Sequence, residues 1–124
     1  MAPIPRTKIV KLPNVDRAFV PERKLTEYLL STTHPSGRGK AIFFARFGFT
    51  EAAWESLGDA LRRHARESDV VVTEETPFGT SYAIDGPLTA PDGRTPRVRA
   101  VWFIESGEVI PALVTAYPLK GDRR

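Results

Sequence analysis

The first half of the chain carries apolar residues at helical spacing. Leu25, Tyr28 and Leu29 are three to four positions apart, which is the repeat of a helix face that packs against a core. Pro21 suits the first turn of a helix, because its fixed φ angle is helical and an N–H is not needed there. The pattern therefore predicts a helix over residues 21–30.

Two further helices are expected before the pattern changes. Residues 40–47 continue the helical spacing and end at Gly48, a residue type favoured just after a helix because it tolerates a left-handed backbone. Residues 50–68 form the next predicted helix, with Thr50 as its N-terminal cap. His64 is expected to face solvent on this helix, because arginines surround it in the sequence.

The second half of the chain has the features of strands joined by short turns. β-branched and aromatic residues gather in four runs, and connectors rich in proline and glycine separate them. Connectors of this length favour hairpins, so the economical topology is an antiparallel meander. The predicted fold is α+β, with two to three N-terminal helices packed on four strands, at residues 70–73, 80–84, 97–104 and 112–117.

The length of 124 residues and the 41% hydrophobic and 27% charged content fit one soluble globular domain. We expect a basic, proline-rich lead at residues 1–13, a helical part at 14–68 and the sheet at 69–119. No apolar run is long enough to cross a bilayer and no signal peptide is recognised, so a cytoplasmic protein away from membranes is expected. The pattern does not indicate an oligomeric state.

The absence of cysteine excludes disulfides, thiolate metal sites and cysteine nucleophiles. The two histidines are far apart in the chain, so we expect neither a metal nor another cofactor. Residues 1–50 hold nine Lys and Arg against three acidic residues, which gives 9 − 3 = +6. Such a basic half suits a polyanion such as nucleic acid, and the alternative is an ordinary solvated surface.

One predicted loop gathers groups that could hold a phosphate. It brings His34, Arg38 and Lys40 close to the expected start of a helix, where free N–H groups also attract anions. Imidazole, as a residue type, titrates near neutral pH and can carry a proton during catalysis. The loop lacks the pattern of a phosphate-binding P-loop, and a solvated surface loop is the alternative.

Two predicted strands add polar pairs at a spacing of two, which puts each pair on one face. Arg97 and Arg99 could direct two guanidinium groups at phosphate oxygens, or could simply keep an edge strand soluble. Thr115 and Tyr117 could position a phosphate or a ribose hydroxyl, or could be half-buried packing residues. Asp85 has no partner that the sequence reveals, and we expect it on the surface.

The chain resembles an uncharacterised bacterial family, a domain of unknown function that also occurs at the C-termini of polymorphic toxins. The resemblance covers about residues 12–118. The matching segments include Leu12-Pro13-Asn14-Val15-Asp16, Glu22-Arg23-Lys24-Leu25, His34-Pro35, Gly37-Arg38, Lys40-Ala41, Tyr82, Arg97-Val98-Arg99 and Val114-Thr115-Ala116-Tyr117-Pro118. A looser similarity extends to the ribonuclease toxins grouped around barnase, EndoU, colicin nucleases and RelE.

That looser resemblance implies metal-independent RNA cleavage, in which a ribose 2′-oxygen attacks the adjacent phosphate. His34 is then the acid or base, Lys40 holds the phosphate and Arg99 stabilises the charge of the transition state. Further assigned positions are Thr115 and Tyr117, which place the RNA backbone, and the substrate-binding residues Arg38, Arg97 and Tyr82. An antitoxin or immunity protein is a candidate partner beside RNA. The alternatives are a module that binds RNA or protein without cleaving a bond, and a dimerising accessory domain.

Overall fold

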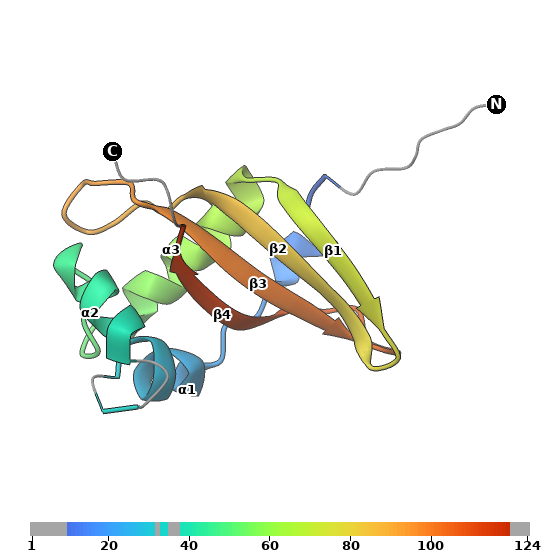
Figure 1. The fold of residues 1–124 in the computed structure, drawn as a ribbon, viewed down its shortest axis with the longest axis horizontal. Helices are drawn as coiled ribbons and strands as arrows, with labels where there is room; N and C mark the ends of the chain where they lie inside the picture. Colours follow the sequence, from blue (N-terminus) through green and yellow to red (C-terminus); the bar gives the residue numbers. More distant parts are fainter. Residues whose placement is uncertain (1–9, 32, 35–37, 120–124) are drawn as a thin grey trace.

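The computed structural model describes residues 10–31, 33–34 and 38–119, and its centre is one four-stranded antiparallel sheet (Figure 1). The strands follow one another in the sheet in chain order, so the predicted meander is confirmed. Most of the predicted lead, and residues 35–37 of the predicted phosphate loop, lie outside the described residues. The strands are β1 (Val70–Thr76), β2 (Gly79–Pro87), β3 (Arg97–Glu105) and β4 (Ala112–Pro118).

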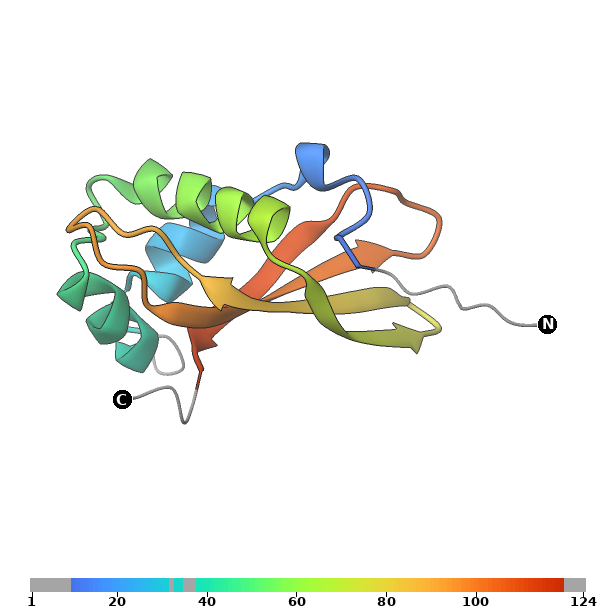
Figure 2. The same cartoon turned by 90° about the horizontal axis from the view of Figure 1, so that it is seen from above.

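The helices precede the sheet in the chain and pack mainly on one of its faces, as Figure 2 shows for α3. This arrangement confirms the α+β fold class. None of the helices in the described residues is long and apolar enough to span a membrane. In chain order the elements are η1 (Val15–Arg17), α1 (Glu22–Lys24), the π-helical turn η2 (Leu25–Leu29), α2 (Arg38–Arg46) and α3 (Trp54–Glu67).

The core lies between α3, η2 and the covered face of the sheet. Val98, Ala100 and Trp102 alternate along β3 and are fully buried, so they form the face of this strand that the helices cover. The sheet approaches α3 so closely that a Cβ atom on Gly86 would overlap the Oγ atom of Ser68. Glycine is therefore required where β2 passes beneath the end of the helix.

His64 corrects one expectation about α3. Its side chain is 1% exposed, and Nε2 lies 3.1 Å from the carbonyl oxygen of Val98. Leu57, Leu61 and Ala65 on the same helix are fully buried, and His64 lies on their face. The prediction that His64 faces solvent was wrong, because helical periodicity outweighs the neighbouring arginines.

Thr50 begins a turn before α3 rather than the helix itself. Its hydroxyl accepts a hydrogen bond from the N–H of Ala53 at 3.2 Å, as an N-cap would, while regular helix begins at Trp54. Ahead of α1, Phe19 pairs with Ala112 in a parallel bridge beside β4. This bridge places the start of α1 next to β4, where the candidate site is formed.

Candidate functional site

A hollow of about 680 Å³ opens where α1 and η2 meet β4. We call it the Tyr28 pocket, after the aromatic ring at its centre. Its lining combines basic, aromatic and hydroxyl side chains with one carboxylate, that of Glu27, and the basic groups and rings suit a ligand that is anionic and carries rings. The lining residues used below are Arg23, Lys24, Glu27, Tyr28, His34 and Thr115.

The side chain of Tyr28 contacts residues from each neighbouring element. Its hydroxyl lies 3.2 Å from Oγ1 of Thr115 on β4, and its ring meets the His34 ring edge-on at a centroid distance of 5.1 Å. The ammonium groups of Lys24 and Lys40 lie 5.5 and 5.4 Å from the ring centroid. Tyr28 therefore joins His34, Lys40 and Thr115, three residues that the sequence analysis placed in a catalytic site.

The π-helical turn fixes the position of Tyr28. Leu25 and Leu29 are fully buried against the core, so the stripe predicted from their spacing anchors this segment. The N–H of Leu30 donates to the carbonyl of Leu25 at 2.8 Å, a bond over five residues that widens the turn. Turns of this kind are common at functional sites. Tyr28 lies between the two leucines and is half-buried, with its hydroxyl directed to β4.

Electrostatics around Tyr28 favour loss of its phenolic proton. Burial alone would raise the pKa, but hydrogen bonds with Thr115 and Lys40 and the charges of Lys40 and Lys24 outweigh it. The pKa of Tyr28 is therefore lowered from its ordinary value. A phenol in this setting is a better proton donor than an ordinary tyrosine.

A local turn orients His34. The Oγ atom of Ser31 accepts hydrogen bonds from the backbone N–H groups of Thr33 and His34, both at 3.3 Å. Ser31 is itself buried at the end of η2. The turn holds the start of the loop against the helix, so the imidazole stays beside Tyr28.

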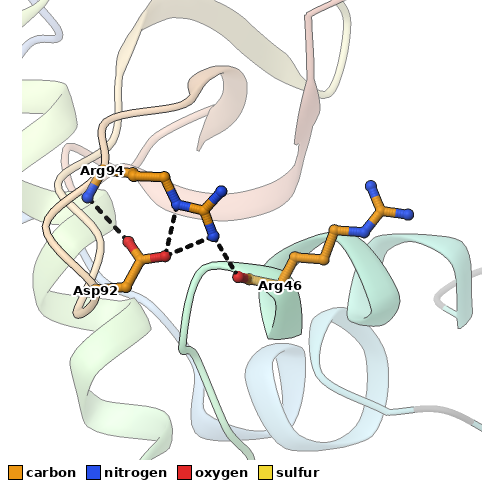
Figure 3. Close-up of polar contacts among 3 residues, drawn as sticks. All are labelled: Arg46, Asp92 and Arg94. Carbon is orange, nitrogen blue, oxygen red and sulfur yellow. Dashed lines mark hydrogen bonds and ion pairs between the residues drawn. The ribbon is translucent and has the colours of Figure 1, made fainter.

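Lys40 lies in the first turn of α2, and the other end of this helix is fastened by the loop between β2 and β3 (Figure 3). Arg94 donates from Nη2 to the carbonyl oxygen of Arg46 at 2.7 Å, and its guanidinium lies 4.4 Å from the Phe47 ring centroid. Asp92 pairs with Arg94 at 2.6 Å, and this hydrogen bonding lowers the pKa of Asp92. Gly48, with φ at 99°, ends the helix as predicted.

Arg99 lies on the open face of the sheet, in a fork with Asp85. Nε and Nη2 of Arg99 donate to the two carboxylate oxygens at 2.7 and 2.9 Å. The hydrogen bonds to Asp85, and a further one with Tyr117, raise the pKa of Arg99 despite partial burial. The expectation that Asp85 lies on the surface was wrong: its side chain is 17% exposed, and the register of β2 and β3 pairs it with Arg99.

The register of β4 relates this fork to the Tyr28 pocket. Thr115 pairs with Val101 and Tyr117 with Arg99, so Thr115 and Tyr117 follow one face of the strand. Contacts thus run from His34 through Tyr28 to Thr115, and two residues further along β4 from Tyr117 to Arg99. The structure places the expected catalytic residues along one side of the sheet, in two neighbouring groups.

The three residues predicted to bind substrate lie in different parts of the fold, and one of them is in the core. Arg97 is exposed at the start of β3, and Arg38 begins α2. Tyr82 is 7% exposed and pairs with Trp102 on the helix-covered face, so its ring belongs to the core. We therefore leave Tyr82 out of the site.

Tyr28 and Lys24 are the site residues that the sequence analysis did not assign. Tyr28 was interpreted as part of an apolar stripe, and the signal that separates it from the leucines is its hydroxyl group. Lys24 lies four positions before Tyr28, one helical turn away, which puts its ammonium group over the ring. Within residues 10–31, 33–34 and 38–119, no group of three His, Asp or Glu side chains could hold a metal ion.

Comparisons with known proteins give a family and a fold. The model of a family described as "Domain of unknown function (DUF6883)" matches residues 11–120. No curated protein sequence matches the chain. A chain of the solved complex "Contact-dependent growth inhibition toxin - immunity protein complex from Klebsiella pneumoniae 342" has 12% sequence identity and a TM-score of 0.68, with 86% of this chain and 97% of that chain covered. This likeness shows a shared fold.

Proposed function

The chain belongs to the DUF6883 family, a domain of unknown function, and we propose from its pocket that it is a metal-independent ribonuclease of toxin type. One observation carries the proposal. His34, Lys40 and Thr115 come from a loop, a helix and a strand that are distant in the chain, and all three meet at Tyr28. His34 and Thr115 line the hollow together with Tyr28, and Lys40 lies beside the same phenol. An acid or base, a cation and hydroxyl groups are the groups that RNA cleavage without a metal requires.

The cleavage is a transfer within the RNA. The 2′-oxygen of a ribose attacks the adjacent phosphorus, the bond to the 5′-oxygen breaks, and a 2′,3′-cyclic phosphate and a 5′-hydroxyl remain. His34 exchanges a proton with the reacting oxygens, and Lys40 offsets the negative charge of the phosphate. Thr115 and Tyr117 place the RNA backbone along β4.

Arg99 acts on the RNA indirectly, through Tyr117, and does not contact the phosphate itself. Two of its donors point to Asp85, and Tyr117 is its paired residue on β4. A guanidinium held by a carboxylate from one neighbouring strand and next to a phenol from the other is suited to fixing its neighbours. We assign Arg99 to orienting Tyr117, in place of the direct charge stabilisation that the family resemblance implies.

The fold likeness and the pocket together favour a toxin with a neutralising partner. The similar chain comes from a complex that contains a toxin and an immunity protein. Basic groups gathered around a hollow fit the component that acts on a polyanion. We infer that an immunity protein or antitoxin with an acidic surface covers the Tyr28 pocket in the producing cell.

The test is incubation of the purified protein with end-labelled RNA in excess chelator, followed by identification of the product ends. Wild-type protein is expected to leave cyclic phosphates, and His34→Ala to cleave about a hundredfold more slowly. Arg66→Ala, which removes an exposed charge on α3, is the control and should cleave normally. RNA that binds in low salt but stays intact would reject the nuclease and favour the binding module.

A further inference from the structure

The most constrained polar group in the Tyr28 pocket is the phenol itself. Its oxygen lies 3.2 Å from Oγ1 of Thr115, its ring meets the imidazole of His34, and the ammonium group of Lys40 lies 5.4 Å from the ring centroid. Packing by a ring of any kind would account for the contact with His34. It would not account for a hydroxyl held by a second hydroxyl at the edge of a hollow, on a ring that has two ammonium groups beside it.

The proposed reaction needs two groups that move protons. One takes the proton from the attacking 2′-hydroxyl, and another protonates the departing 5′-oxygen, because an alkoxide is a poor leaving group. His34 can serve for one of the two steps. The other step requires a second titratable group on the same hollow.

We propose that Tyr28 is the general acid of this reaction and that His34 is the base, an inference that rests on the proposed function. The proton of the 2′-hydroxyl passes to His34 as the bond between 2′-oxygen and phosphorus forms. The proton of the Tyr28 phenol passes to the 5′-oxygen as the bond between phosphorus and that oxygen breaks. The imidazolium and phenolate that remain are neighbours, so proton return from His34 to Tyr28 restores the starting state.

The charges that face Tyr28 support this direction of proton flow. Lys24 from α1 and Lys40 from α2 lie 5.5 and 5.4 Å from the ring and stabilise a phenolate. Arg23 and Glu27 also line the pocket, and they form an ion pair with each other at 3.2 Å. The net field at the phenol therefore comes from the two lysines, which agrees with its lowered pKa.

The other tyrosines differ from Tyr28 in their surroundings. Tyr82 is buried in the core, and Tyr117 pairs with Arg99 on the open face of the sheet. Tyr28 is the tyrosine that lines the pocket and touches His34. Tyr82→Phe consequently removes the same hydroxyl group at a position outside the site and serves as the matched control.

The test compares two leaving groups in otherwise identical RNA oligonucleotides. One carries an ordinary phosphodiester, and the other carries sulfur in place of the bridging 5′-oxygen, which departs as a thiolate without needing a proton. Tyr28→Phe should slow the oxygen-linked RNA by about a hundredfold and the sulfur-linked RNA by less than about fivefold. His34→Ala should slow both, and Tyr82→Phe should slow neither.

Two outcomes overturn the assignment while leaving the nuclease intact: equal slowing of both RNAs by Tyr28→Phe, or slowing of neither. Failure of the wild-type protein to cleave either RNA would instead reject the proposed function. A fluorinated tyrosine at position 28 provides a second measurement that preserves the hydroxyl. Because a general acid must be protonated and fluorination lowers the phenol pKa, the alkaline limb of the pH–rate profile should move to lower pH. An unmoved limb contradicts the proposal.

Discussion

The protein holds its cationic groups in two different ways on the two sides of β4. On the sheet side, Arg99 of β3 is locked to Asp85 by two hydrogen bonds of 2.7 and 2.9 Å. On the helix side, the ammonium groups of Lys24 and Lys40 lie 5.5 and 5.4 Å from the ring centroid of Tyr28, which lines a hollow of about 680 Å³. Basic residues that look equivalent in the sequence therefore have different surroundings.

The difference separates groups that organise the fold from groups suited to a ligand. A guanidinium in a fork with a carboxylate is already matched in charge and geometry, so a phosphate would have to displace the carboxylate. A lysine beside an aromatic ring gains much less from that contact. We expect substitutions on the sheet side to lower mainly stability, and those around Tyr28 to lower mainly cleavage.

Lys40→Met should have the largest effect on cleavage. Loss of the ammonium group removes the cation that offsets the phosphate charge, and the single-turnover rate should fall about a hundredfold. The free energy of unfolding should stay within about 1 kcal/mol of wild type, because the side chain is only half-buried and its contact with the Tyr28 ring is weak. Arg66→Met, on the exposed face of α3, is the matched control. A Lys40→Met protein with normal cleavage would remove Lys40 from the site.

Arg99→Met should have the opposite pattern: a large loss in the free energy of unfolding and a smaller loss in the rate of RNA cleavage. The substitution removes both hydrogen bonds from the half-buried carboxylate of Asp85. Urea denaturation should therefore show a loss of about 2 kcal/mol in the free energy of unfolding. Cleavage by the folded fraction should fall less than for Lys40→Met. If stability is unchanged while cleavage is lost, Arg99 acts on the substrate directly, and the comparison of the two sides fails.

A pH series sharpens the comparison, because His64 affects only stability. Burial lowers the pKa of His64 in the native state, while the unfolded chain keeps a value near 6.5. Below pH 6.5 the unfolded state binds more protons, so the free energy of unfolding falls as pH decreases. The contribution is complete above pH 6.5, and its slope is at most about 1.4 kcal/mol per pH unit. His64→Gln should flatten this part of the curve, and an unchanged slope would assign the effect to other groups.

Arg94→Ala should produce the smallest change. It removes the hydrogen bond to the last turn of α2 and the stacking on Phe47, at an exposed position in the loop between β2 and β3. The loss in the free energy of unfolding should be smaller than for Arg99→Met. The rate of cleavage should fall about threefold, because Lys40 at the other end of α2 is then held less firmly. Arg63→Ala, which also loses an exposed ion pair, is a suitable control.

The meander could be predicted because alternation and turn residues are local signals. The burial of Val98, Ala100 and Trp102 follows from their spacing, and the hairpin connectors fix the strand order. The burial of His64 could also have been predicted, because His64 lies on the same face of α3 as Leu57 and Leu61. Its neighbouring arginines obscured that periodicity.

The site could be predicted only in part, because long-range register decides it. Asp85 and Arg99 are joined by the pairing of β2 with β3, which the composition of either strand does not reveal. Tyr28 has the spacing of a core residue, and its role depends on Thr115 from a strand 87 positions later. Local patterns therefore pointed to His34 and Lys40 as candidates, whereas the phenol that both contact required the three-dimensional structure.

The most direct test of the account compares Tyr28→Phe with Tyr117→Phe in one single-turnover RNA cleavage experiment with chelator present. Each variant removes one phenolic hydroxyl, the first beside Lys24 and Lys40 and the second beside Arg99. The account predicts a loss of about a hundredfold for Tyr28→Phe and less than about tenfold for Tyr117→Phe. A larger loss for Tyr117→Phe would show that catalysis is centred on the Arg99 side and would contradict the account.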